Sequence, residues 1–334
     1  MCYHVFERSP YVTGLKVLSA PTIFQYGYLG VDAFFLLSGF IIAWTSITYT
    51  PRAFFASRVS RIAPAFMVCC SITFLVVHFA LQKEDVGLVN YLGNVSLWAI
   101  SPLQYLKEFK SVDGVYWTLL AESHFYCIFA VFLIPALRRF LYPFIFFWLA
   151  MVLAIEFSPI HGAVYTAGKI LFMQDRAPYF IAGLLFALTY QKRPQIQDLA
   201  AFGLTLWIAI RHAWHRSDRL NKDYGYVLHH AAVAALLISF YAIFALVAYG
   251  RFDEQRWKPF AYLGALTYPI YLLHQMISYA MIVHLGPVIT PIVAAFISIA
   301  TVILLAIAVH HGVERPVGRP LRKWLDGKPK AGTP

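Results

Sequence analysis

Long apolar runs, separated by short polar segments, recur along almost the whole chain. A helix needs about 20 predominantly apolar residues to cross the hydrocarbon core of a bilayer. By this measure, full spans are predicted at roughly 31–49, 60–81, 115–136, 140–157, 176–190, 198–212, 226–249, 259–284 and 287–311. The pattern therefore predicts an all-α fold, a polytopic transmembrane helical bundle with nine full spans.

The N-terminal segment and the segment 82–114 depart from this pattern. Residues 1–6 resemble the last turns of a first helix whose beginning is absent, and 7–25 is predicted as a loop because Pro10, Gly14 and Pro21 interrupt it. The segment 82–114 is too polar for a span and predicts interfacial or re-entrant helices.

The C-terminal boundary follows from Glu314-Arg-Pro316, which is expected to end the last span. We therefore expect a membrane domain over 1–316, with a truncated first helix, and a basic cytoplasmic tail over 317–334. The composition leaves no room for a separate soluble domain. Of the residues, 60% are hydrophobic and 13% charged, whereas a soluble domain carries about 25% charged residues.

The net charge of +11 indicates lipid rather than nucleic acid as the partner, because the cations form short clusters between apolar runs. Most lysines and arginines lie in alternate loops and in the tail, so the positive-inside rule places the C-terminus in the cytoplasm. The exception is 211–223, an expected outer loop with four cations. The four cysteines form no C-x-x-C pair, and neither a disulfide nor a metal site is expected.

Arg58 and Arg61 are three residues apart and lie on one helix face at the expected cytoplasmic boundary. Two guanidinium groups in this arrangement can bind phosphates bidentately. Spacing alone favours the simpler interpretation, an interfacial anchor whose side chains reach the lipid headgroups.

Glu122 lies inside an apolar span, in the stretch Tyr116-Trp-Thr-Leu-Leu-Ala-Glu-Ser-His-Phe-Tyr126. A carboxylate at that depth must be protonated, paired with a cation or exposed to a wet cavity. His124 is a poor direct partner because it points to a different helix face. An acid inside a span favours a functional role.

Two of the many histidines are candidates for chemistry. His274 follows Tyr268-Pro-Ile-Tyr-Leu-Leu, a helix interrupted by proline, which frees a backbone carbonyl. His4 lies at an outer helix end, where a neutral imidazole can act as a base. Taken alone, its position favours an ordinary interfacial side chain.

The stretch Gly30-Val-Asp-Ala-Phe-Phe-Leu-Leu-Ser-Gly-Phe40 combines an acid at the mouth of an apolar helix with a notch of small residues two turns deeper. Asp32 is either an orienting residue of the site or a cap of the helix N-terminus. Ser38 and Gly39 leave room for a ligand or for a neighbouring helix.

Five motifs together resemble the integral-membrane acyltransferase-3 family of bacterial surface-glycan O-acyltransferases. They are G-V-D-A-F-F-L-L-S-G-F, R-V-S-R-I-A-P, Y-W-T-L-L-A-E-S-H-F-Y, Y-P-I-Y-L-L-H-Q and the closing E-R-P, in the family's order from His4 to Pro316. The resemblance implies ten membrane helices, a cytoplasmic acyl-CoA donor and a carbohydrate or glycolipid acceptor, such as lipopolysaccharide, at the membrane.

The resemblance also implies roles for single residues. His4 matches the catalytic histidine, Arg58 and Arg61 match the arginines that bind coenzyme A, and Glu122 matches the acid of the W-[ST]-L-x-x-E element. By triad logic, Glu122 or Asp32 would orient the imidazolium of His4. The remaining residues of the expected substrate site or channel are Ser38, Gly39, Trp117, Tyr268 and His274.

The sequence thus predicts a multi-pass enzyme of the bacterial inner membrane that moves an acyl group, acetyl by expectation, from acyl-CoA to a sugar hydroxyl. No metal and no nucleic acid are expected. The alternative is a proton-coupled transporter, which also uses intramembrane acids, histidines and proline-broken helices. A third interpretation is a non-catalytic subunit that binds acyl-lipid or glycan.

Overall fold

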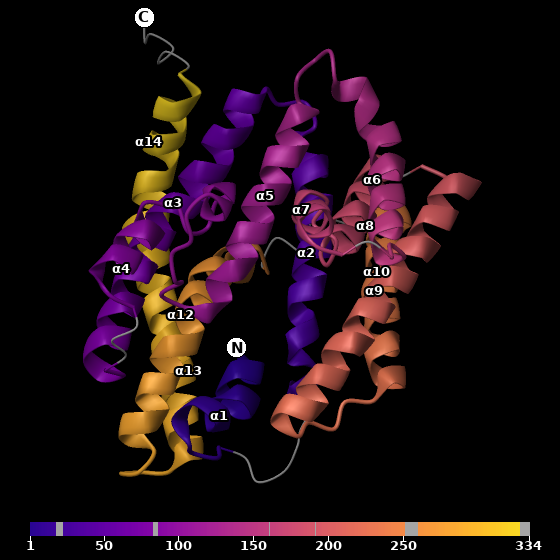
Figure 1. Cartoon of the computed structure of the whole chain (residues 1–334). Coiled ribbons are helices and arrows are strands. Elements are labelled where there is room, and N and C mark those ends of the chain that lie inside the picture. The colour runs from indigo at the N-terminus through magenta and orange to yellow at the C-terminus, as the bar shows by residue number, and fades with distance from the viewer. Residues whose placement is uncertain (18–22, 83–85, 160, 191, 251–259, 328–334) are drawn as a thin grey trace, which may run out of the picture. The chain divides into compact units, whose positions relative to one another are not determined.

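The computed structural model describes residues 1–17, 23–82, 86–159, 161–190, 192–250 and 260–327. Throughout these ranges the chain forms helices and turns and no strand (Figure 1). The predicted all-α helical membrane bundle is confirmed. Several residues of the charge pattern, including Lys83, Arg251, Arg256 and Lys258, lie outside the described residues.

The chain divides into two compact units. Unit 1 comprises Met1–Phe24, Tyr49–Tyr126 and Glu254–Pro334, and unit 2 comprises Gln25–Thr48 and Cys127–Asp253. The described helices of unit 1 are η1 (Tyr3–Arg8), α1 (Ser9–Thr13), α3 (Pro51–Leu75), η3 (Val76–Ala80), α4 (Leu88–Val95), η4 (Pro102–Tyr105), η5 (Gly114–Tyr116), α12 (Ala261–Leu285), α13 (Pro291–Val309), η8 (His310–Glu314) and α14 (Arg315–Asp326).

The described helices of unit 2 are α2 (Gly30–Ser46), η6 (Arg138–Phe140), α6 (Leu141–Glu156), α7 (Ala163–Leu171), α8 (Ala177–Leu188), α9 (Ile196–Tyr224) and α10 (His230–Tyr249). Two helices, η2 (Ile23–Leu29) and α5 (Trp117–Val131), continue from one unit into the other.

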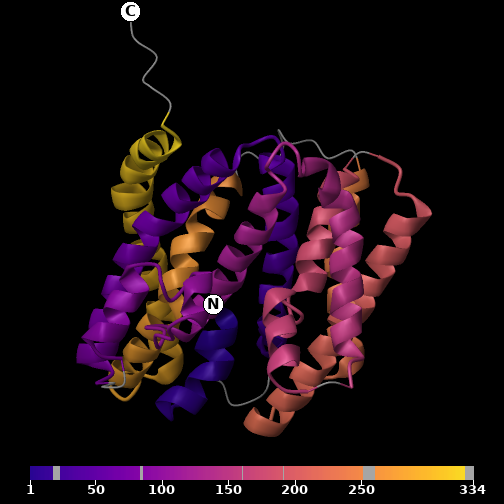
Figure 2. The same ribbon diagram turned by 45° about the horizontal axis from the view of Figure 1, so that its top comes forward.

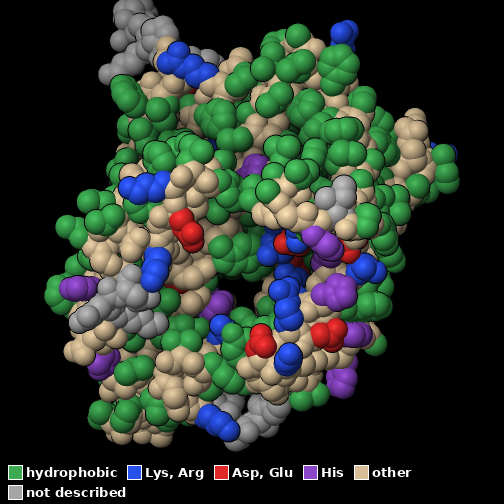
Figure 3. Space-filling model, viewed as in Figure 1, with side chains coloured by type: hydrophobic (Ala, Val, Ile, Leu, Met, Phe, Trp, Pro, Cys, Tyr) green, Lys and Arg blue, Asp and Glu red, His purple; other side chains and the backbone are tan. Residues whose placement is uncertain are grey.

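Five described helical stretches are long and apolar enough to cross a membrane by length and composition. They are Ile23–Ser46, Pro51–Ala80, Arg138–Glu156, His230–Tyr249 and Pro291–Asp326. Large apolar side chains such as Phe79, Leu246 and Leu304 are more than 60% exposed, and hydrophobic side chains cover large parts of the face seen in Figure 3. Such a surface suits lipid as the surrounding solvent, because apolar groups need no hydration there.

In unit 1, the antiparallel helices α12 and α13 pack together, and α14 packs along α3 (Figure 2). The start of α3 follows from local chemistry. Thr50 caps it by accepting a hydrogen bond from the Ala53 amide at 3.2 Å, and Pro51 occupies the first turn, where no amide donor is needed. The core between α3, α5 and α12 includes Phe66, whose ring lies edge-on to that of Tyr116 at 5.0 Å.

In unit 2, α2 packs closely on α8 because both helices carry glycine at the contact. A Cβ added to Gly39 would lie 2.5 Å from the Phe180 carbonyl oxygen, and one added to Gly183 would meet the backbone of Leu36. Small residues let two membrane helices approach to backbone contact. The notch predicted at Gly39 is therefore filled by a neighbouring helix.

Several predicted helix boundaries were wrong, because the prolines lie in the first turns of helices rather than between helices. The expected loop over 7–25 is helical up to Thr13, since Pro10 opens α1 and Gly14, at φ +73°, ends it. The helix of the second span begins at Pro51 instead of residue 60, which places the arginine pair inside it.

Two further corrections concern polar helices. The expected outer loop 211–223 is the second half of α9, which ends only at Gly225 with φ +63°. The last helix does not end at Glu314-Arg-Pro316 but continues through η8 into α14, with Pro316 again in a first turn. The short helix α7 had no counterpart in the predicted elements.

Candidate active site

The histidine predicted to be catalytic lies against a second histidine and a tyrosine of α12 in unit 1. The Nδ1 atom of His4, on η1, is 3.3 Å from the hydroxyl oxygen of Tyr279. The rings of His4 and His274 meet edge-on with centroids 5.0 Å apart. Two residues that the sequence suggested separately, His4 and His274, thus share one site.

The orientation of His274 is fixed by its own helix. Its Nδ1 atom is 2.7 Å from the backbone carbonyl oxygen of Tyr271. A carbonyl only accepts hydrogen bonds, so Nδ1 carries the proton and donates it, and the neutral ring keeps its lone pair on Nε2. The side chain is 3% exposed, so this buried imidazole is held in one tautomer beside His4.

Tyr271 connects this pair with the start of α5. Its hydroxyl is 2.6 Å from the Thr118 hydroxyl and donates to the Val115 carbonyl at 2.6 Å. Trp117, at the first position of α5, is 39% exposed. The W-T-L-L-A-E element is therefore anchored on the same stretch of α12 that carries His274.

Glu122 lies one turn further along α5, and its side chain is 9% exposed. It is hydrogen-bonded to the Tyr126 side chain, on which the charges of Arg58 and Arg61 also act. The charges of Glu122 and Arg61 act in turn on the half-buried Tyr268 of α12. Four residues that the sequence singled out (Arg58, Arg61, Glu122 and Tyr268) thus form a second cluster within unit 1.

The two guanidinium groups of this cluster differ in exposure. Arg58 is half-buried, with its guanidinium carbon 5.5 Å from the centroid of the Phe54 ring. Arg61 is exposed on the same helix face. Tyr268 fixes α12 against α3 by donating a hydrogen bond to the Ile62 carbonyl at 3.1 Å. The arrangement offers an anion one preorganised cation and one accessible cation.

Asp32 belongs to unit 2, where it forms an ion pair with Arg216 of α9. Its side chain is fully buried, and the guanidinium of Arg216 also lies over the Tyr28 ring, 5.1 Å from the centroid. The proposed role as an N-terminal cap is wrong, because α2 begins at Gly30 after a 3₁₀ turn and no side chain caps it. Its role as an orienting residue stays a prediction.

The other two residues of the predicted substrate site or channel in α2, Ser38 and Gly39, are also buried in unit 2. Gly39 faces the backbone of α8. Of the two expected uses of the notch, the contact with a neighbouring helix is the one observed.

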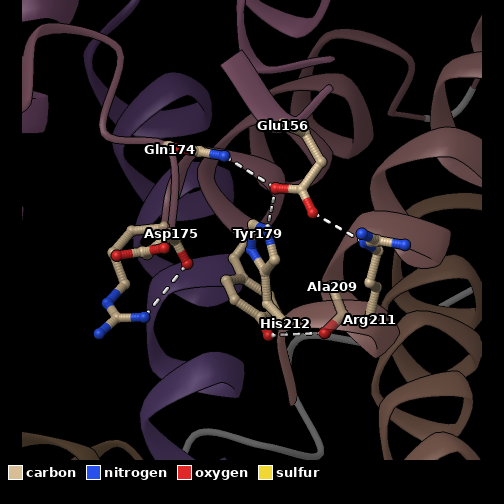
Figure 4. Close-up of polar contacts among 8 residues, drawn as sticks. Glu156, Gln174, Asp175, Tyr179, Ala209, Arg211 and His212 are labelled. Carbon is tan, nitrogen blue, oxygen red and sulfur yellow. Dashed lines mark hydrogen bonds and ion pairs between the residues drawn. The ribbon is translucent and has the colours of Figure 1, made fainter. Parts of the chain in front are cut away.

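A polar cluster around Glu156 in unit 2 was missed by sequence reasoning (Figure 4). Its carboxylate accepts hydrogen bonds from Gln174 Nε2 at 2.8 Å and Arg211 Nε at 2.8 Å, and it lies 2.9 Å from His212 Nε2. The available signal was the i, i+4 spacing of Arg211 and His212 with His215 and Arg216, which repeats along one helical face.

In the described part of the chain no group of three or more histidine, cysteine or acidic side chains is placed to hold a metal ion. Unit 1 offers two clusters of polar side chains. A histidine contacts a tyrosine hydroxyl in one cluster, and two arginines lie near a carboxylate in the other.

Residues 1–311 match the family described as an acyltransferase domain, the acyltransferase-3 family. This match covers nearly the whole chain. Together with the helical membrane fold of the chain, it defines the class of protein as a membrane acyltransferase. The chain belongs to this family of enzymes.

Three relatives are similar to the chain at low identity. "Putative peptidoglycan O-acetyltransferase YrhL" of Bacillus subtilis is 22% identical over 94% of this chain and 56% of that protein. "O-acetyltransferase OatA" of Staphylococcus aureus is 28% identical over 34% of this chain and 21% of that protein. An uncharacterized protein of Haemophilus influenzae is 23% identical over 50% of this chain and 77% of that protein.

The chain thus spans about half the length of the Bacillus protein, 56%, and about a fifth of the Staphylococcus protein, 21%. No solved structure matches the chain.

Proposed function

We propose that this chain is an O-acyltransferase of the bacterial inner membrane that moves an acetyl group from cytoplasmic acetyl-CoA to a hydroxyl of a cell-envelope glycan. The observation that carries the proposal is the contact of His4 with Tyr279 and His274 in the unit that also holds the cluster of Arg58 and Glu122. The family supports acyl transfer, and the names of two relatives support acetyl as the group that is moved. The name of the Bacillus relative makes peptidoglycan the first acceptor to test.

The proposed reaction begins with proton transfer. When His4 donates from Nδ1 to the Tyr279 oxygen, its Nε2 lone pair is available to accept the proton of the sugar hydroxyl. The sugar oxygen then bonds to the thioester carbonyl carbon. As the carbon–sulfur bond breaks, the proton passes from the imidazolium to the leaving coenzyme A sulfur, and atoms and charge balance.

In this mechanism the two clusters of unit 1 have separate tasks: the arginine cluster binds the donor, and the histidine cluster carries out the transfer. Arg58 and Arg61 hold the donor's phosphates by charge-assisted hydrogen bonds. On α12, Tyr268 in the arginine cluster and His274 beside His4 are six positions apart, which is a rise of about 9 Å at 1.5 Å per residue. The thioester arm would have to cover at least this rise to reach His4. The C-terminus is on the cytoplasmic side in this arrangement, as the positive-inside rule indicates.

The test is transfer of label from radioactive acetyl-CoA to peptidoglycan fragments by the purified protein in lipid nanodiscs. His4→Ala is expected to lower the rate by about 10²–10⁴-fold with unchanged thermal unfolding. His284→Ala, a control at the far end of α12, removes an exposed histidine whose Nε2 lies 2.8 Å from the Ala80 carbonyl oxygen, and should keep most of the activity.

Two results would contradict the proposal. Transfer that survives His4→Ala would remove His4 from the chemistry. If acetyl-CoA labels none of the offered peptidoglycan, lipopolysaccharide and total membrane glycolipid, while vesicles containing the protein accumulate a solute with a proton gradient, the chain is a transporter.

A further inference from the structure

A pocket of about 400 Å³ lies wholly within unit 2, at the turns that precede α6 and α9. Four cations line it. Arg138 and Arg139 come from η6, and Lys192 and Arg193 come from the turn after α8. None of these residues belongs to the acyl-transfer site proposed above.

The one carboxylate in the lining, that of Asp198, is already engaged. Asp198 Oδ1 accepts a hydrogen bond from the Tyr142 hydroxyl at 2.6 Å, and Oδ2 accepts one from the Gln195 backbone amide at 2.8 Å. It thereby closes the capping box at the N-terminus of α9. Gln197 in turn donates to the Tyr142 oxygen at 2.9 Å.

The uncharged polar groups of the lining are also paired. The Thr189 hydroxyl donates to the Leu185 carbonyl at 2.7 Å and lies 2.7 Å from the Tyr249 hydroxyl. Within the described ranges, no ion pair joins Lys192 or Arg193 to a carboxylate. Four positive charges thus converge on one pocket against a single negative charge.

The four cations are not arranged like side chains that only anchor a helix at the membrane surface. Cations that only anchor a helix extend separately toward lipid headgroups, and like charges held around one space repel each other. An anion in the pocket removes this repulsion and supplies acceptors for the arginine donors. The remaining lining is apolar and consists of Ile47, Leu141 and Leu188, which suits a ligand that combines a charged head with an apolar part.

We propose that this pocket is a binding site for a phosphate ester. Its source is either an anionic phospholipid headgroup or a soluble metabolite that carries the same group. Arg139 offers a planar donor fork for phosphate oxygens. Arg138, whose Nη2 also donates to the Leu133 carbonyl at 3.4 Å, adds charge beside it, and Lys192 and Arg193 add charge from the other turn. The α9 N-terminus, kept in place by Asp198, adds a favourable dipole.

The experiment measures binding to the purified full chain in neutral detergent by native mass spectrometry and titration. The probes are dioctanoyl phosphatidic acid and glycerol 3-phosphate, which present the same phosphomonoester with and without acyl chains. Dioctanoyl phosphatidylcholine, in which the phosphate is masked by choline, serves as the reference ligand. Saturable binding of either phosphomonoester above this reference is expected.

The decisive variant is Lys192→Gln with Arg193→Gln, at two exposed positions. Its affinity for the bound probe should fall about tenfold or more, as expected for the loss of charge-assisted hydrogen bonds. The matched control, Arg219→Gln with Lys222→Gln, removes two exposed cations of α9 outside the pocket and should change affinity less than about twofold.

Binding of phosphatidic acid alone assigns the site to a lipid headgroup, and binding of both probes assigns it to the phosphate ester itself. The proposal is overturned if neither phosphomonoester binds above phosphatidylcholine. It is equally overturned if the two double variants weaken binding to the same extent, since the attraction would then come from net charge. Because the readout is binding, failure here leaves the acyl-transfer proposal untouched.

Discussion

The Nδ1 atom of His4 lies 3.3 Å from the hydroxyl oxygen of Tyr279, although 275 positions separate the two residues in the chain. The sequence suggested a carboxylate for this place, by analogy with catalytic triads. A neutral hydroxyl orients an imidazole by the same hydrogen bond but does not stabilise its positive charge as a carboxylate does. Tyr279 is therefore a positioning residue in the proposed mechanism.

Tyr279→Phe tests this positioning. The change keeps the buried ring and removes the hydroxyl's contacts with His4 and Arg8. Loss of the hydrogen bond to His4, with a net contribution of about 0.5–1.5 kcal/mol, corresponds to a fall in kcat of roughly two- to tenfold. KM for acetyl-CoA should not change, because the donor's phosphates are bound elsewhere. Steady-state transfer kinetics in nanodiscs measure both quantities.

The control is Tyr91→Phe, which removes another tyrosine hydroxyl of unit 1, one that lies 2.9 Å from the Ser71 hydroxyl. It should leave kcat unchanged. Equal losses in the two variants would indicate a general effect on stability and would refute the positioning role of Tyr279.

Arg61→Ala tests donor binding. Loss of a charge-assisted hydrogen bond to phosphate costs about 1.5–3 kcal/mol, so KM for acetyl-CoA should rise by roughly ten- to a hundredfold while kcat stays within about twofold. Arg61→Lys keeps the charge without the planar fork and should give an intermediate KM. A lowered kcat at unchanged KM would instead place Arg61 in the chemical step.

Much of the fold could be predicted because a membrane imposes a simple rule on the sequence. Apolar runs of the required length indicated helices wherever they occurred, and α10 and α13 lie within the predicted ranges. The rule fails where a helix is polar. The second half of α9 was mistaken for a loop because its cations are balanced by acids from distant segments, such as Asp32 and Glu156.

The candidate site shows the same limit. Family motifs pointed to His4, His274, Glu122 and the arginine pair as single residues, and the structure groups them into two clusters of unit 1. No local pattern could have shown that Tyr279 contacts His4, since the pairing depends on how η1 meets α12.

Asp32→Asn should destabilise the protein strongly. The change leaves Arg216, which is 20% exposed, without its fully buried carboxylate partner, and breaking a buried ion pair from one side costs up to about 3–5 kcal/mol. Thermal unfolding in detergent should show a large loss for this variant. Asp218→Asn, which removes an exposed partner of His230, should cost less than about 1 kcal/mol.

The double variant Asp32→Leu with Arg216→Met decides whether Asp32 also orients the reaction. Apolar replacement of both members of a buried pair is often neutral for stability, so the double variant should unfold near the wild-type temperature. Recovered stability with normal acetyl transfer would make the pair purely structural. Recovered stability without transfer would support the predicted orienting role.

Gly39→Ala tests whether the notch of α2 serves packing or a ligand. The added methyl group would lie 2.5 Å from the Phe180 carbonyl oxygen, and overpacking of this kind costs about 1–3 kcal/mol. Gly203→Ala is the matched control, because nothing lies within 4 Å of its added Cβ on α9; removing glycine from a helix interior should stabilise by about 0.5–1 kcal/mol. A lowered unfolding temperature for Gly39→Ala alone is expected, because α8 fills the notch. Unchanged stability combined with lost acetyl transfer would rule out a packing role and return Gly39 to the substrate path.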